Sequence, residues 1–184
     1  MARFEDRATR PARGPQHILR WKLGRNRDPR PEDFAALDAV RPQTHDGGAA
    51  ALVGGAPVAV WIGHATCALR LGGKLIVTDP IWSKAISGVV PRLVAPGIAL
   101  EVMPPIDIVL VTHDHRDHMD LPTLGKLPDS ATYIVPLGNA ARLHKPNVVE
   151  LDWWQSHLVG DVEVTLVPAR HWSMRAPWNR NDML

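Results

Sequence analysis

The sequence has almost no cysteine, with Cys67 as the only one among 184 residues. A single thiol excludes an internal disulfide framework and a zinc site built from four cysteines. The sequence also lacks an apolar run of about 18 residues, the length of a membrane-spanning helix. No apolar signal segment follows the first methionine. We therefore expect a reduced, cytoplasmic setting.

Internal repeats and low-complexity segments are absent as well, and the composition is that of a globular protein. Hydrophobic residues make up 45% and charged residues 22% of the chain. These fractions exclude a disordered acidic tail, a collagen-like repeat and a coiled coil. The length suits one domain of ordinary size rather than two large ones.

Charge is unevenly distributed along the chain, although the formal net charge is only +2. Residues 1–30 carry nine arginines and lysines against three acids, whereas residues 31–184 carry twelve against sixteen. Such a basic arm is typical of a segment on anionic lipid or nucleic acid, and equally of a solvated, partly ordered extension. An arginine-rich start also resembles a transit peptide, against which Glu5 and Asp6 argue. We expect residues 1–56 to be a basic extension and linker.

From residue 57 onward, strand patterns alternate with short helical patterns, which predicts an α/β or α+β domain over residues 57–184. The clearest strand is IDIVLVT at 106–112, because a nearly continuous β-branched run is typical of a strand buried on both faces. Residues 80–105 have no clear periodicity and are expected to form a long loop with room for one helical turn. Other strands are expected at 58–62, 67–71, 74–78, 131–135, 147–151 and 161–167, and short helices at 121–127 and 138–144.

Three histidines and two aspartates stand within six residues directly after the 106–112 strand, in the string HDHRDH at 113–118. Residues two apart point the same way in extended backbone, so His113 and His115 can converge on one cation. Asp117 and His118 lie one bend further on and can face a second cation. Imidazole and carboxylate are good ligands for zinc and other borderline metals. The string therefore predicts a metal site at the carboxyl end of a strand.

His171 is the next candidate ligand, because it too follows an expected strand. It would complete a three-histidine site with His113 and His115 and leave one coordination position for water. Asp114 points the other way in the string, so we expect it to make a structural hydrogen bond. Four further histidines are expected to be surface or structural residues: His17, His45, His144 and His157.

The string at 113–118 is similar to the metal motif of the metallo-β-lactamase superfamily, and the resemblance spans residues 57–184. Further segments resemble the branch containing N-acylphosphatidylethanolamine-hydrolysing phospholipase D and its bacterial relatives. The resemblance implies an αββα sandwich with a binuclear zinc site, where a metal-bridging hydroxide hydrolyses a phosphodiester. Lactonases and nucleases of the same superfamily remain alternatives. The further segments are WIGHAT at 61–66, TDPIWS at 78–83, PPID at 104–107 and PARHW at 168–172.

Matched by position, the resemblance implies that His113, His115 and His171 hold the first zinc. Asp117 and His118 are implied as ligands of the second zinc, and Asp117 as the catalytic residue that orients the hydroxide.

Three more residues have implied roles around these ligands. Asp79 is implied to accept a hydrogen bond from a ligand imidazole and fix its orientation. His64 either lines the substrate site or makes a structural hydrogen bond in its turn. Arg116 stands where the phospholipases often carry an aromatic residue that touches substrate, so it either pairs with a phosphate oxygen or faces solvent.

The family pattern normally continues with a bridging aspartate and a last histidine, whereas this sequence ends thirteen residues after His171. The donors present fill three places at one zinc and two at the other, so we expect one ion here and two in the complete site. We expect the N-terminal half of the sandwich only, completed by a longer chain, a second copy or a partner. Without completion, it would be an inactive metal-binding fragment.

The expected partners follow from this resemblance and from the basic arm. They are a lipid or other small ester substrate and an anionic membrane, met at the periphery of the inner membrane. Nucleic acid is not the expected partner.

Overall fold

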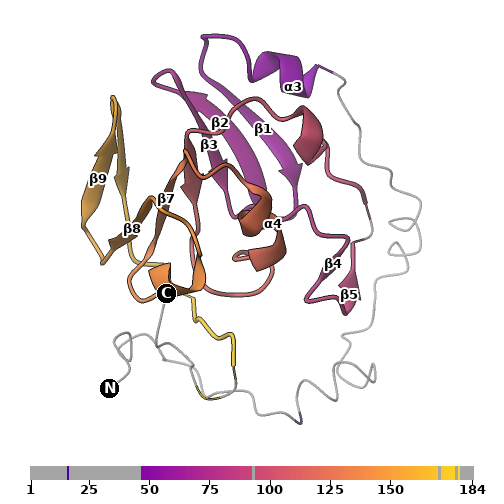
Figure 1. The fold of residues 1–184 in the computed structure, drawn as a ribbon, viewed down its shortest axis with the longest axis vertical. Coiled ribbons are helices and arrows are strands. Elements are labelled where there is room, and N and C mark those ends of the chain that lie inside the picture. The colour runs from indigo at the N-terminus through magenta and orange to yellow at the C-terminus, as the bar shows by residue number, and fades with distance from the viewer. Residues whose placement is uncertain (1–15, 17–46, 93, 170, 177, 179–184) are drawn as a thin grey trace, which may run out of the picture. The chain divides into compact units, whose positions relative to one another are not determined.

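The structure, a computed structural model, describes residues 16, 47–92, 94–169, 171–176 and 178. At its centre is a six-stranded mixed sheet with the strand order β1-β2-β3-β6-β7-β8 (Figure 1). The basic arm over residues 1–30 lies outside the described residues, apart from Gln16. Among the described residues, no helix combines the length and apolar character needed to cross a membrane.

One half of the sheet is an antiparallel meander of β1 (Val58–Gly63), β2 (Thr66–Leu71) and β3 (Lys74–Thr78). Gly72 and Gly73 join β2 to β3 with φ angles of 54° and 72°. Two consecutive positive φ angles are the requirement of a tight hairpin turn, and glycine meets it without steric cost.

The other half of the sheet is parallel, with β3 followed by β6 (Ile108–Leu110), β7 (Thr132–Pro136) and β8 (Val148–Leu151). The connections carry helix α4 (Leu121–Lys126) and the 3-10 turn η3 (Ala140–Arg142). Because β3 and β6 are parallel neighbours, the segments that leave their carboxyl ends emerge at the same edge of the sheet.

Both faces of the central strands are buried, which explains their nearly continuous apolar sequences. Along β3, Val77 belongs to a core cluster on one face, and Ile76 belongs to a second cluster on the other. Val109 and Ile108 alternate in the same way along β6. Residues of α4 contribute to the first cluster, and the hairpin of β9 and β10 contributes to the second.

Two short antiparallel hairpins flank the sheet. The first pairs β4 (Ala85–Ile86) with β5 (Val90–Pro91), inside the segment expected to be a long loop. The expected helical turn in that loop is η2 (Leu100–Val102). The second hairpin pairs β9 (Ser156–Val159), which the sequence pattern did not predict, with β10 (Val162–Thr165).

The α/β class predicted from the sequence is confirmed by the mixed sheet and its few helices. The helix predicted over 138–144 is wrong, because only the single turn η3 forms there. The Asn139 amide donates to the Pro136 carbonyl instead of capping a helix. Near the amino end, α3 (Gly48–Ala51) and the fully buried Leu52 lie within the segment expected to be extension and linker.

Candidate metal centre

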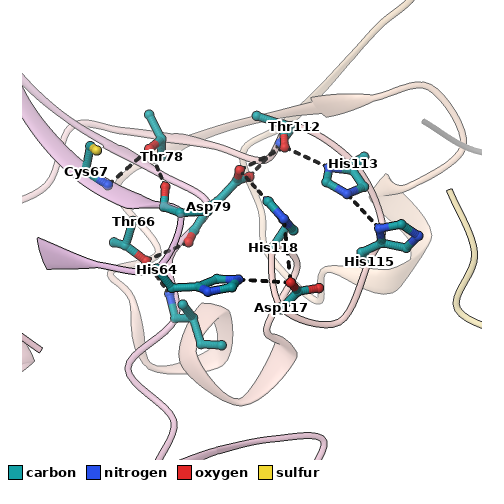
Figure 2. Close-up of polar contacts among 12 residues, drawn as sticks. His64, Thr66, Cys67, Thr78, Asp79, Thr112, His113, His115, Asp117 and His118 are labelled. Carbon is teal, nitrogen blue, oxygen red and sulfur yellow. Dashed lines mark hydrogen bonds and ion pairs between the residues drawn. The ribbon is translucent and has the colours of Figure 1, made fainter. Parts of the chain in front are cut away.

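The predicted ligands lie mainly in the loop after β6, at the carboxyl edge of the sheet (Figure 2). The loop folds back on itself, because the His115 carbonyl accepts hydrogen bonds from the backbone N–H groups of His118 and Met119. The Arg175 guanidinium donates to the carbonyls of Asp114 and Met119, at 3.1 and 2.8 Å. A cation from the C-terminal part of the chain therefore holds the loop in this shape.

Asp114 is fully buried within this loop. Burial, followed by repulsion from Arg116, lowers the pKa of Arg175, and attraction by Asp114 partly offsets that shift. The charge of Asp114 thus stabilises the half-buried guanidinium of Arg175 that holds the loop. Asp114 stands in neither group of convergent donor atoms, as the sequence predicts.

The first donor set consists of His113, His115 and His171. His113 Nε2 lies 2.9 Å from His115 Nδ1, which in turn lies 3.3 Å from His171 Nε2. A tetrahedral zinc ion with nitrogen ligands at about 2.0–2.1 Å separates those nitrogens by about 3.3 Å, so the spacing suits one ion. The Trp172 ring packs edge-on against His115, with centroids 4.3 Å apart, and restricts the rotation of that imidazole.

Two histidines of the first donor set, His113 and His115, are held in the neutral form that binds metal. Burial lowers the pKa of His113 to about 3, and repulsion from His118 and His115 adds to the effect. Burial and the neighbouring His171 lower the pKa of His115 to about 4. Both imidazoles are therefore unprotonated at neutral pH, and a metal need not displace a proton from either.

The second donor set consists of His64, Asp117 and His118. His64 Nε2 donates to Asp117 Oδ2 at 2.9 Å, and His118 Nε2 lies 3.7 Å from the same oxygen. Burial alone would raise the pKa of Asp117, but the hydrogen bond from His64 and the nearby imidazoles outweigh it and lower that pKa. The carboxylate is therefore ionised at neutral pH and gives this set a negative charge.

Asp79 connects the two donor sets through its carboxylate (Figure 2). Its Oδ2 accepts from His118 Nδ1 and from the Thr112 hydroxyl, each at 2.8 Å, and its Oδ1 accepts from the Thr112 backbone N–H. A carboxylate can only accept, so His118 carries its proton on Nδ1 and keeps the Nε2 lone pair for a metal.

The same reasoning fixes the tautomer of His113. The Thr112 hydroxyl has one proton and donates it to Asp79, so it must accept from His113 Nδ1, which lies 2.9 Å away. The Nε2 lone pair of His113 then faces the first donor set. One carboxylate thus orients an imidazole in each set, directly for His118 and through Thr112 for His113.

The structure gathers all five sequence-predicted ligands in two adjoining groups, with the rings of His113 and His118 4.1 Å apart. Asp79 accepts a hydrogen bond from His118, one of the predicted ligands. The Arg116 side chain is exposed and donates to the Arg175 carbonyl at 3.1 Å, so its contact with a substrate stays a prediction. The neutral His113 and His115, the ionised Asp117 and the spacing of the donor atoms suit metal binding.

Sequence reasoning missed Thr112 and Arg175. Thr112 directly precedes the first histidine of the string. A hydroxyl at the end of a buried strand, next to the predicted ligands, could have been read as a hydrogen-bond partner for them. Arg175 gave no comparable signal, because its contacts with the loop span 56 and 61 residues.

Comparison with known proteins bears on the same part of the chain. Residues 74–184 match the family described as "Beta-lactamase superfamily domain". The chain is 36% identical over 170 residues to an uncharacterized protein of Mycobacterium tuberculosis, covering 86% of this chain and 44% of that protein. It is 34% identical over 139 residues to the mitochondrial N-acyl-phosphatidylethanolamine-hydrolyzing phospholipase D of Saccharomyces cerevisiae, covering 67% and 29% respectively.

Among solved structures, the chain is similar to an isothiocyanate hydrolase from Delia radicum gut bacteria. That similarity has a TM-score of 0.47 and 21% identity, and it covers 56% of this chain and 44% of the hydrolase. The chain spans less than half the length of both curated relatives described above.

Proposed function

This chain belongs to the beta-lactamase superfamily, and we propose that it is the metal-binding part of a zinc-dependent hydrolase. The proposed substrate is the phosphodiester bond of an N-acylphosphatidylethanolamine-like phospholipid. The observation that carries the proposal is the pair of adjoining donor sets joined by Asp79. Two zinc ions at such a pair of sites would activate water near neutral pH and stabilise charge on a phosphoryl group.

The residues themselves hold and orient the reacting groups in this proposal. His113, His115 and His171 would hold a first ion, which would supply an activated water. Asp117 is ionised, so its carboxylate can accept a hydrogen bond from that water and direct it toward the phosphorus. The contacts of Asp79 with His118 and Thr112 prevent the imidazoles from rotating during this step.

The phospholipid is favoured over other esters by two independent features. A relative with 34% identity is named as a phospholipase D acting on N-acyl-phosphatidylethanolamine. The basic arm over residues 1–30 adds an electrostatic attraction to anionic lipid, worth about 1 kcal/mol for each arginine or lysine near the surface. We propose that the protein works in the cytoplasm at the inner membrane, with the other half of the sandwich supplied by a longer chain or second copy.

A substrate screen tests the activity. The zinc-loaded protein, with the other half of the sandwich present, would be offered N-acylphosphatidylethanolamine vesicles, a sugar lactone and RNA, with release of the N-acylethanolamine head group as the expected result. Cleavage of only the lactone or the RNA would replace the phospholipase proposal with another activity of the superfamily. Bound metal without turnover of any substrate would leave a metal-binding fragment.

A second measurement tests the role of the arm. Changing Arg3, Arg7 and Arg10 to glutamine should weaken binding to anionic vesicles by tens to hundreds of fold, since each charge contributes about 1 kcal/mol. Raising the salt concentration should mimic the change, because surface charges are screened. Unchanged vesicle sedimentation would exclude the arm from membrane binding.

A further inference from the structure

We infer that the β4–β5 hairpin is a membrane anchor, which inserts its tip into a bilayer of anionic phospholipid beside the metal centre. Among the described residues, Val89 and Val90 are the only consecutive large hydrophobic side chains that are exposed, at 72% and 55%. Single exposed apolar residues are normal on a protein surface, whereas apolar side chains gathered at one place mark a site of interaction. The inference deepens the proposed function, on which it rests for the choice of a lipid surface.

The hydrophobic core does not explain the hairpin. In the part of the chain that the structure describes, none of the strand residues at 85, 86, 90 and 91 belongs to either core cluster or packs against one. The tip stands apart from the six-stranded sheet, and Ser87 and Gly88 close it with φ angles of 51° and 71° (Figure 1). A serine in the left-handed region is uncommon. The chain therefore adopts a strained turn that leaves two valines exposed.

The charges near the tip suit an anionic surface. Residues 80–100 contain Lys84 and Arg92 but no aspartate or glutamate. Lys84 is exposed and directly precedes β4. Phosphate head groups attract such a cation, while neighbouring apolar side chains enter the acyl boundary. A symmetric contact between two copies of the hairpin would instead bring like charges together. The pattern thus favours a bilayer over a second copy of the chain.

Hydrogen bonds attach the base of the hairpin to the loop that carries the metal donors. The Arg92 guanidinium donates to the carbonyls of Ile81 and Ser83. The Ser83 hydroxyl donates to Asp120 Oδ2 at 2.5 Å. Asp120 stands two residues after His118 in the sequence. The hairpin and the donor loop therefore form one hydrogen-bonded unit.

The base of the hairpin also contacts the turn beside the second donor set. Arg92 Nη1 lies 3.2 Å from the position that a Cβ on Gly63 would take, and Gly63 directly precedes His64. A strand rises about 3.3 Å per residue, so a tip three residues from its base projects about 10 Å. With the tip in the acyl boundary, the metal centre would lie close to the head groups, where a phosphodiester bond is found.

Vesicle binding in the absence of substrate tests the inference. The zinc-loaded protein, with the other half of the sandwich present, would be sedimented with vesicles of phosphatidylglycerol and phosphatidylcholine at low and high salt. The variants are the double change Val89→Ser and Val90→Ser, the single change Val89→Trp, and the control Val53→Ser. Val53 is similarly exposed, at 70%, but follows α3 rather than lying in the hairpin.

The double serine variant should bind vesicles about 10- to 30-fold more weakly at both salt concentrations, because salt does not screen the burial of apolar side chains. This result would separate the hairpin from the basic arm, whose attraction weakens in salt. Val89→Trp should bind at least about threefold more tightly, because tryptophan favours the membrane interface. A misfolded hairpin could not produce such a gain. Val53→Ser should bind as the unaltered protein does.

A loss of less than about twofold in the double serine variant, an equal loss in Val53→Ser, or a loss in Val89→Trp would overturn the inference. A dimer that the serine changes dissociate, with vesicle binding unchanged, would also overturn it and assign the hairpin to a second copy. These results would leave hydrolysis at the metal centre intact as a proposal. Conversely, the expected vesicle pattern without hydrolysis of N-acylphosphatidylethanolamine would overturn the phospholipase proposal alone.

Discussion

The two donor sets lie side by side, yet they differ in the type and charge of their ligand groups. The first is three imidazoles, of which His113 and His115 are uncharged at neutral pH. The second contains the ionised Asp117 and two imidazoles, and its His64 and Asp117 side chains are 43% and 34% exposed. Burial keeps His113 and His115 of the first set neutral and ready for metal, whereas the second set relies on negative charge that water screens more. We therefore expect the first set to bind metal first.

Removing one imidazole from the first set should have the largest effect. His115→Ala takes away one of three nitrogen ligands, so the first metal should be lost, with an affinity drop of more than about 100-fold, and hydrolysis with it. Metal content by mass spectrometry and the phospholipid assay check this. Full activity in His115→Ala would contradict the assignment of His115 as a ligand.

Substitutions at Asp79 and Thr112 should have a smaller effect on metal affinity. They distinguish the direct orientation of His118 by Asp79 from the orientation of His113 through Thr112. Asp79→Asn should weaken both metals by about 10–100-fold, because the hydrogen bond to His118 and the relay to His113 both depend on the carboxylate. Thr112→Val keeps the shape of the side chain and removes only the hydroxyl, so it should weaken the first metal about tenfold and spare the second. Co²⁺ titration of both variants, with Thr132→Val as the control, measures the difference. Equal losses at both sites in Thr112→Val would contradict the relay through its hydroxyl.

The smallest effect concerns the pH dependence of stability in the metal-free chain. His113 has a pKa of about 3 in the folded chain against an ordinary value of 6.5, so only the unfolded chain takes up its proton between those values. Its contribution is complete above about pH 6.5 and is lost as the pH falls toward 3, at no more than about 1.4 kcal/mol per pH unit.

His118 should act with the opposite sign. Burial would lower its pKa, but the hydrogen bond and charge of Asp79 outweigh burial and raise it. Its contribution is therefore present below about pH 6.5 and is lost as the pH rises through the raised pKa. Thermal melts between pH 4.5 and 7.5 check both signs. The acid loss should flatten in His113→Gln and steepen in His118→Gln, and identical profiles for the two variants would contradict the assignment.

Prediction from the sequence was most complete where the donors are local. The string at 113–118 places four donors on one loop, and the apolar run before it locates the strand edge, so the position of the site follows from short-range pattern. His171 was predicted only as a completion of that pattern. The contact of His64 with Asp117 could not be predicted, because it spans 53 residues and depends on the pairing of β2, β3 and β6.

The fold shows the same division between local and long-range information. The strands of the meander and of the parallel half follow from their apolar runs and glycine turns. The strand β9 was missed, because its alternation of exposed and half-buried residues is too weak to read without its partner β10. In place of the helix predicted over 138–144, only the turn η3 forms before the chain continues to β8.

The contact between Asp79 and Thr112 has a consequence for how the site comes into being. These residues extend two parallel strands, and the Asp79 N–H continues the pairing by donating to the Leu110 carbonyl. A hairpin such as β2–β3 closes locally, but β3 and β6 meet only after a crossover of about 30 residues has been ordered. The tautomers of His113 and His118 are therefore fixed only when β3 and β6 have paired. Metal affinity in this chain is a property of the finished sheet, and ions that bind there draw the folding equilibrium toward it.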